Sequence, residues 1–251
     1  MPLSAPPRVL AIAGSDSSGG AGIQADIKTI TMLGGYAMTA ITAVTAQNTV
    51  GVQAVEVLPP ELVVAQIDSC LTDIGADAVK VGMLGSPEIA EAVADRLEGL
   101  EIPVVFDPVM VATSGSVLTD EATIAAFGRL IALATLTTPN GPELEALGGA
   151  EAVARRGVPY LAKGGDAGGP DVEDRLVRPG NEDRVWTAGR IDTRHTHGTG
   201  CTLSSAIATL LGKGQPLEEA IEGARAFVRA ALEAAPGFGA GHGPMGHQGV
   251  R

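Results

Sequence analysis

One motif late in the chain has the composition of an anion-binding helix start with a reactive group beside it. It reads HGTGCTLS over residues 197–204. The first turn of a helix leaves N–H groups without acceptors, and the helix dipole favours negative charge there, so Gly198, Thr199 and Gly200 are candidates for stabilising a transferring phosphoryl group. Cys201 lies in the same turn, where we expect a lowered thiol pKa and a thiolate that takes the proton of a substrate hydroxyl. The alternative is that Cys201 is merely a small buried residue without a catalytic role.

A second glycine-rich motif, GSDSSGGAG over residues 14–22, lies between an apolar run and a helical pattern. Such a loop brings backbone N–H groups close to a ligand. Gly20, Gly22 and Ala25 fit a loose dinucleotide-binding pattern, but the next strand-like segment, residues 39–48, has no acidic residue for a ribose. The nicotinamide interpretation is therefore disfavoured. A glycine turn that binds no ligand stays open.

Acidic and polar residues follow several of the strand-like segments. Asp107 follows one, Asn140 and Glu143 lie in TPNGPE, and Lys163 begins KGG. Mg²⁺ prefers hard oxygen ligands, commonly one or two carboxylates with water and phosphate, which makes Asp107 and Glu143 candidate metal ligands. Lys163 is a candidate contact to a nucleotide phosphate. Helix caps or solvated loop charges are the alternatives.

The histidines do not form a recognisable metal site. His195 and His197 are two residues apart, but zinc needs three or four ligands and no further ligand cluster is visible in the sequence. His242 and His247 lie in a glycine-rich C-terminal tail, residues 237–251, where we expect surface or closing-loop positions.

Strand-like and helix-like segments alternate along the chain, which predicts a mostly parallel central sheet with helices on both faces. We expect one domain over residues 1–251, with residues 1–7 flexible. Strands are predicted over 9–13, 39–45, 78–81, 104–106, 135–138 and 158–162, with a late antiparallel pair at 174–177 and 184–186. Helices are predicted over 23–33, 61–71, 87–97, 119–133 with Thr119 as N-cap, 143–147, 150–156, 200–211 and 217–234.

The candidate residues share a place in this scheme, because each follows a predicted strand. They are Gly14, Gln47, Asp107, Asn140 and Lys163. In such sheets ligands bind beyond the carboxyl ends of the strands. The sequence therefore predicts one site at that edge.

Composition and short motifs exclude several classes of protein. A net charge of −12 without a Lys/Arg cluster argues against a nucleic-acid surface. The pair Gly212-Lys213 is followed by Gly214, so no Walker phosphate loop is present. Two cysteines make no disulfide framework and suit a cytoplasmic protein. We find no signal peptide and no transmembrane run, and expect no membrane partner.

These motifs, in this order from Arg8 to about Pro244, resemble the phosphomethylpyrimidine kinases of the ribokinase-like superfamily. The resemblance implies a three-layer α/β ribokinase-like fold. It also implies a stand-alone kinase of thiamine biosynthesis, with ATP and Mg²⁺, that phosphorylates 4-amino-5-hydroxymethyl-2-methylpyrimidine and then its monophosphate. The matching strings are AIAGSDSSGGAGIQADIKT (11–29), TAVTAQNTVGV (42–52), KVGML (80–84), DPVMVATSG (107–115), TPNGPE (138–143), KGG (163–165) and HGTGCTLS (197–204).

The resemblance also assigns roles to individual residues. Cys201 takes the place of the aspartate base used by most ribokinase-like enzymes, beside the glycine-rich turn 198–200. Gln47 occupies the pyrimidine-contacting position, where some relatives carry Glu. The remaining roles are substrate contacts for Gly14, Asp26 and Val109, nucleotide contacts for Thr138, Asn140 and Lys163, and metal binding for Asp107 and Glu143. A homodimer is implied as well.

The chain departs from the family pattern mainly on the nucleotide side. Thr113 stands where many relatives have Lys, Asp166 where His is common, and His195 where Asn is usual. The stretch between Asn140 and Lys163 is short for the family. Two rival functions therefore stay open: a pyridoxal or pyridoxine kinase on the same fold, and a non-catalytic pyrimidine-binding protein.

Overall fold

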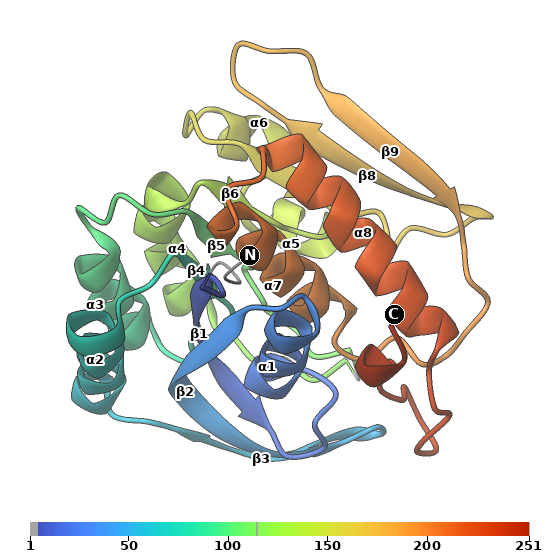
Figure 1. Ribbon diagram of the computed structural model, residues 1–251, viewed down its shortest axis with the longest axis horizontal. Helices are drawn as coiled ribbons and strands as arrows, with labels where there is room; N and C mark the ends of the chain where they lie inside the picture. Colours follow the sequence, from blue (N-terminus) through green and yellow to red (C-terminus); the bar gives the residue numbers. More distant parts are fainter. Residues whose placement is uncertain (1–4, 114, 251) are drawn as a thin grey trace.

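In the computed structural model, which describes residues 5–113 and 115–250, strands predicted to pair in parallel do so at the centre of one sheet (Figure 1). The order is β3-β2-β1-β4-β5-β6-β7-β8-β9; pairs from β2 through β7 are parallel, and β3, β8 and β9 add antiparallel edges. The strands of the described part are β1 (Arg8–Asp16), β2 (Tyr36–Asn48), β3 (Gly51–Val57), β4 (Ala78–Val81), β5 (Val104–Phe106), β6 (Leu136–Thr137), β7 (Tyr160–Ala162), β8 (Asp171–Val177) and β9 (Arg184–Gly189).

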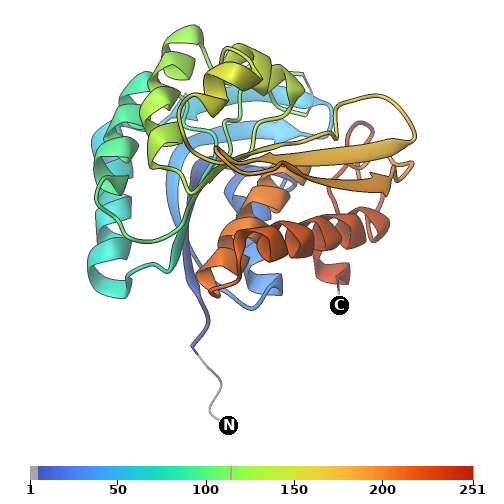
Figure 2. The same ribbon diagram turned by 90° about the horizontal axis from the view of Figure 1, so that it is seen from above.

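Helices cover both faces of this sheet, as predicted (Figure 2). One layer contains α2 (Pro60–Ser69), α3 (Pro87–Leu97), α4 (Glu121–Leu133), α5 (Gly141–Ala146) and α6 (Ala150–Ala154); a π-helical turn, Cys70–Ile74, extends α2. The other contains α1 (Gly22–Met32), α7 (Thr199–Gly212) and α8 (Leu217–Glu233). No helix of the described chain combines the length and apolar character needed to cross a membrane.

Two apolar clusters hold the layers together, one on each face of the sheet. Successive side chains of a strand point to opposite faces. In β1, Leu10 and Ile12 therefore join the cluster under α2, α3 and α4, while Val9 and Ala11 join the cluster under α1, α7 and α8. All four side chains are fully buried. This two-sided burial explains why the central strands read as continuous apolar runs.

Two local features differ from the sequence-based expectation. Strand β3 was not predicted, because it lies at the edge of the sheet with most of its residues exposed and so has no apolar pattern. Helix α4 is capped by Asp120, whose Oδ1 accepts the Thr123 N–H at 2.8 Å, rather than by Thr119. The Thr119 hydroxyl instead donates to the Val109 carbonyl at 2.9 Å.

Much of the C-terminal tail packs against the core. His247 is 1% exposed, and its Nε2 lies 2.8 Å from the Thr202 hydroxyl of α7, so the expectation of a surface position for His247 is wrong. Gly246 allows this packing, since a Cβ there would lie 1.9 Å from the Ala234 carbonyl oxygen. His242 is exposed, as expected.

An ion pair is buried completely between the sheet and α1. Lys80 Nζ lies 3.0 Å from both carboxylate oxygens of Asp26, and the Ser205 hydroxyl donates to Asp26 Oδ1 at 2.6 Å. Burial opposes a charge on Lys80, but the carboxylates of Asp26 and Asp107 outweigh it and raise the lysine pKa. A buried pair costs desolvation energy and is harmful when one partner is lost.

We predict that Lys80→Met lowers the free energy of unfolding by about 3–5 kcal/mol, because Asp26 is left as an unpaired buried charge. The double variant Lys80→Met/Asp26→Leu should recover a large part of the loss. Urea denaturation of the three proteins measures both values. Glu151→Gln, which breaks an exposed ion pair with Arg155, is the control and should leave the unfolding midpoint unchanged. Equal stability of Lys80→Met and the native protein would contradict the prediction.

Candidate active site

A cleft of about 810 Å³ opens at the carboxyl ends of the central strands. The segment Val109–Leu118, described except for residue 114, borders it and carries the bridge between Val111 and Val117. Most of the residues predicted from the sequence line this cleft. They are Gly14, Gln47, Asp107, Val109, Asn140, Glu143, Lys163, Gly198, Thr199, Gly200 and Cys201.

Two of the predicted residues lie beneath the cleft rather than on its wall. Asp26 is fully buried in its ion pair with Lys80, so it offers a ligand no direct contact in this structure. Thr138 is fully buried too, and its hydroxyl donates to Asp107 Oδ1 at 2.9 Å. The resemblance assigned a ligand contact to each residue, but the sequence does not show which way either side chain points.

The start of α7 packs directly on the first glycine-rich loop. Gly198 is the N-cap residue and has a positive φ of 83°. A Cβ on Gly198 would lie 2.0 Å from the Gly20 carbonyl oxygen, and a Cβ on Gly20 would lie 2.3 Å from the His197 ring. Neither position can accept a side chain without moving the other loop. The two motifs therefore form one surface, and the first turn of α7 lines the cleft beside it.

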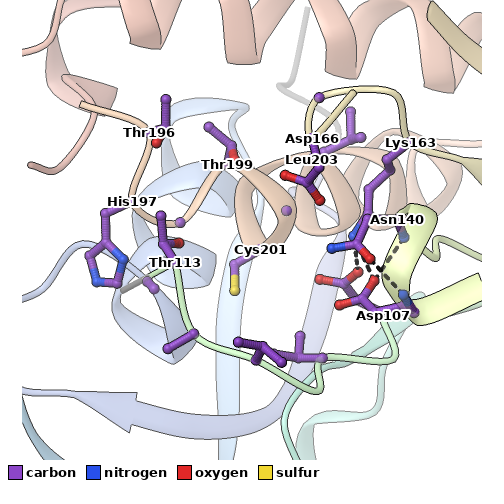
Figure 3. A pocket seen from close by; sticks show the side chains of 18 of the residues that line it. Asp107, Thr113, Asn140, Lys163, Asp166, Thr196, His197, Thr199, Cys201 and Leu203 are labelled. Carbon is purple, nitrogen blue, oxygen red and sulfur yellow. Dashed lines mark hydrogen bonds and ion pairs between the residues drawn. The ribbon is translucent and has the colours of Figure 1, made fainter. Parts of the chain in front are cut away.

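Cys201 lies in the first turn of α7, with its sulfur between His197 on one side and Asp107 with Lys163 on the other (Figure 3). Burial raises the pKa of this thiol to about 11; Lys80 works against the rise, while Asp26 and Asp107 add to it. The lowering expected from the helix start is therefore wrong, because desolvation and two carboxylates outweigh the dipole. The resting site holds a protonated thiol.

Lys163 joins two carboxylates at the other end of the cleft. Its Nζ lies 2.7 Å from Asp107 Oδ1 and 3.6 Å from Glu143 Oε2. Burial would raise the pKa of Asp107, but Lys163 and Lys80 outweigh it and lower the value. Burial raises the pKa of Glu143 despite Lys163. Asn140 and Glu143 also form a reciprocal cap at the start of α5, so the fold holds both side chains in place.

The carboxylates of Asp107 and Glu143 suit a cation that takes most of its other ligands from water and phosphate. Within the described residues, no group of three His, Cys, Asp or Glu side chains is arranged to hold a metal ion. Asp107 Oδ2 has a long 3.5 Å contact with the Ser204 hydroxyl. Two carboxylates are what Mg²⁺ uses when phosphate and water supply the other oxygens, so Asp107 and Glu143 fit that ion and do not fit a closed zinc site.

The cleft continues toward β8, β9 and α8, where its wall mixes apolar side chains with charged ones, among them Asp174, Arg225 and Arg229. Arg190 braces the glycine-rich segment that follows Lys163, with its guanidinium donating to the carbonyls of Gly165 and Gly169 at 2.8 and 2.9 Å. This arm of the cleft can take a flat, apolar ring next to the charged groups. Its lining includes Asp166, Val172, Ala188, Arg190, Ile191, Val228 and Leu232.

Two functional candidates were quoted within motifs but given no role. Asp16 is 3% exposed and accepts N–H bonds from Ser18, Gly20 and Ala21, at 2.8–3.0 Å. His197 contacts Asp16 across the two loops, with its Nε2 2.9 Å from Asp16 Oδ2. The sequence does show Asp16 inside a glycine-rich loop and His197 next to a predicted helix start. Only the tertiary structure shows that these two side chains are in contact.

Alkylation of the thiols tests the environment of Cys201. We predict that in Cys70→Ser, which leaves one cysteine, iodoacetamide reacts slowly at neutral pH, and that the rate rises with pH toward a midpoint near 11. A raised pKa means less thiolate at any lower pH. Mass spectrometry measures the rate, and the same variant unfolded in urea should show an ordinary midpoint of about 8.5. A folded-state midpoint at that ordinary value would contradict the assigned environment.

Comparison with known proteins identifies the family. The family model described as phosphomethylpyrimidine kinase matches residues 16–246. A hydroxymethylpyrimidine/phosphomethylpyrimidine kinase of Streptomyces coelicolor is 46% identical, covering 96% of this chain and 94% of its own. A Bacillus subtilis pyridoxal kinase, solved with ADP, has a TM-score of 0.90 at 34% identity and covers 98% of this chain and 99% of its own. A phosphomethylpyrimidine kinase of Clostridium difficile has a TM-score of 0.77 at 39% identity over 90% of this chain and 99% of its own. The chain therefore belongs to the phosphomethylpyrimidine kinase family and has the ribokinase-like fold.

Proposed function

We propose that this protein transfers the terminal phosphoryl group of ATP to the hydroxymethyl oxygen of 4-amino-5-hydroxymethyl-2-methylpyrimidine, and then phosphorylates the monophosphate, in thiamine biosynthesis. One observation carries the proposal. The start of α7, with Cys201, lies in one cleft between His197, whose ring contacts the Gln47 amide, and Asp107 with Lys163 (Figure 3). That arrangement puts a phosphoryl-stabilising turn between a pocket for a heteroaromatic ring and a pocket for a nucleotide.

The turn Gly198–Cys201 would stabilise the transferring group. The Thr199 N–H already donates to the Thr196 carbonyl at 3.2 Å, so the N–H groups of Gly200 and Cys201, together with the helix dipole, would stabilise the developing negative charge. As the hydroxyl oxygen bonds to phosphorus and the bond to ADP breaks, the hydroxyl proton would pass to Cys201 Sγ. Because the resting thiol has a pKa of about 11, only about one site in 10⁴ carries the thiolate at pH 7. That thiolate is strongly basic.

The acidic end of the cleft would hold the donor. Asp107 and Glu143 would bind Mg²⁺ together with phosphate oxygens; the bound ion would supply charge neutralisation for the phosphates. Lys163, already paired with both carboxylates, would contact a phosphate as a point charge. Thr138 would support Asp107 from below through its hydroxyl. Asn140 would hold the first turn of α5 in place, because its Oδ1 accepts the Glu143 N–H.

Gln47 would recognise the substrate ring. It is 9% exposed at a β-bulge in β2, and its backbone N–H and carbonyl both bond to the Ser17 hydroxyl at 2.9 Å. A bulge re-aims a side chain, and here it turns the amide into the cleft. Gly14 would approach the ring through its backbone and Val109 would cover it.

Pyridoxal phosphorylation is the second candidate, favoured by the likeness in fold to the Bacillus subtilis pyridoxal kinase. Both substrates are small heteroaromatic rings with a hydroxymethyl group, so the two activities call for similar clefts. The homodimer implied by the resemblance and the cytoplasmic location indicated by the two cysteines stay predictions.

A coupled assay of ADP release tests the function directly. With Mg·ATP we predict turnover with the hydroxymethylpyrimidine and with its monophosphate, and at least tenfold lower kcat/KM with pyridoxal. Turnover with pyridoxal alone would assign the rival kinase activity. No turnover with any of the three, despite measurable binding of the pyrimidine by calorimetry, would indicate a binding protein.

We predict that Cys201→Ala lowers kcat by about 10²–10⁴, the usual scale for loss of a general base, while the pyrimidine still binds. Below pH 11, kcat/KM of the native enzyme should rise with pH, since each added unit increases the thiolate fraction about tenfold. Cys201→Asp, whose base is ionised at neutral pH, should lose this rise. Turnover of Cys201→Ala close to that of the native enzyme would remove Cys201 from the role of base.

A further inference from the structure

A chain of polar side chains connects the first glycine-rich loop to the ring-recognising amide. His197 Nε2 lies 2.9 Å from Asp16 Oδ2 and 3.2 Å from the Gln47 side-chain nitrogen, Nε2. The Gln47 side-chain oxygen, Oε1, lies 3.2 Å from the Thr45 hydroxyl. Asp16, Thr45 and His197 are each less than 5% exposed. Water therefore has little room to satisfy these groups, and each donor has to find its acceptor within the chain.

Asp16 can only accept hydrogen bonds here. Its carboxylate oxygens accept backbone N–H bonds from Ser18, Gly20 and Ala21. Burial would raise the pKa of Asp16, but the hydrogen bonds from His197, Ala21 and Ser18 outweigh it and hold the value at about 2. An ionised carboxylate has no proton to give. The nitrogen of His197 that faces it, Nε2, therefore carries a proton and donates.

That proton decides how the Gln47 amide must lie. With the amide nitrogen toward His197, two donors face each other at 3.2 Å. In the same orientation the Thr45 hydroxyl, which has one proton, would have to donate to both Gln47 Oε1, at 3.2 Å, and the Ser15 carbonyl, at 2.9 Å. Turning the amide by 180° replaces the donor–donor contact with a donor–acceptor contact and leaves the Thr45 proton to Ser15 alone. The Gln47 oxygen then accepts from His197, whose Nε2 proton is shared between Asp16 and Gln47, and the Gln47 nitrogen donates to Thr45 Oγ1. Nitrogen and oxygen of an amide have nearly the same shape, so this network determines the assignment.

We propose that Asp16, acting through His197, fixes the orientation of the Gln47 amide, and that His197 is thereby a positioning residue that sets which heteroaromatic ring the cleft accepts. This inference rests on the proposed kinase function only for the identity of the ring. The locked amide keeps one N–H and one oxygen lone pair beyond those used inside the chain. An amide offering both selects a ring with an acceptor nitrogen next to an exocyclic amino group, as an aminopyrimidine has. A pyridine nitrogen flanked by carbon substituents can make one of the two bonds.

A double-mutant cycle tests the coupling, with KM for the pyrimidine and for ATP, and kcat, as readouts. His197→Phe keeps the ring that packs on Gly20 but loses the donor. We expect it to raise the pyrimidine KM about tenfold, the scale of one buried hydrogen bond, with kcat and the ATP KM within about twofold. Its preference for the pyrimidine over pyridoxal should fall by a similar factor. In the Gln47→Ala background, His197→Phe should add less than about twofold.

Two further variants separate positioning from general damage to the cleft. His197→Asn keeps an N–H donor and should recover part of the pyrimidine KM. Tyr36→Phe changes an exposed side chain at the start of β2 that does not line the cleft; it is the control and should leave all three constants unchanged. Thermal melting checks that each variant is folded.

The tautomer can be read in the native protein without any variant. Long-range ¹H–¹⁵N spectra of histidine-labelled protein should show a protonated Nε2 for His197. An unprotonated Nε2 would overturn the proposal, as would additive effects of His197→Phe and Gln47→Ala in the cycle. Failure of the kinase function has a different signature, since the native protein would then show no pyrimidine turnover while the protonated Nε2 remains.

Discussion

The close packing of two glycine-rich loops is the constraint on which the site depends. The loop after β1 and the turn before α7 lie far apart in the sequence, and Gly20 and Gly198 let their backbones meet where any Cβ would collide. The contact between Asp16 and His197 closes the same junction with a hydrogen bond of 2.9 Å. Because both loops begin or end at the carboxyl edge of the sheet, this junction brings Gln47 and the start of α7 into one cleft.

Beneath that junction, buried charges alternate in sign. Asp26 pairs with Lys80, and Asp107 with Lys163, so that negative and positive groups surround the start of α7. Each pair costs desolvation energy, and in return the ammonium groups keep the carboxylate of Asp107 ionised inside the protein. The same charges act on Cys201, where burial and the acids prevail over Lys80 and the thiol stays protonated. Under the proposed function, Cys201 would therefore act through a small population of strongly basic thiolate.

Sequence reasoning succeeded where a pattern is local. The β-α alternation predicted the parallel core, and α3 and β4 were predicted with the bounds that the structure shows. Strand β3 failed because an exposed edge strand carries no burial pattern. The prediction of a surface position for His247 was wrong because a glycine-rich segment can pack closely as well as form an exposed loop. At Gly246 the absence of a side chain lets the tail approach the end of α8. These errors share a cause, because contacts between distant segments produce no hydrophobic periodicity in the sequence.

Residue types and spacing were enough to determine the family, the fold class and the edge of the sheet at which the cleft opens. Glycines next to strand ends and a cysteine at a helix start are local requirements of backbone shape and helix dipole, and they can be read one segment at a time. Side-chain direction and solvent exclusion were decided only by tertiary structure: Asp26 turned inward to Lys80, Thr138 went under Asp107, and the thiol pKa of Cys201 rose instead of falling. The physical reason is that desolvation and Coulomb interaction depend on distances in space, which the order of residues along the chain does not contain.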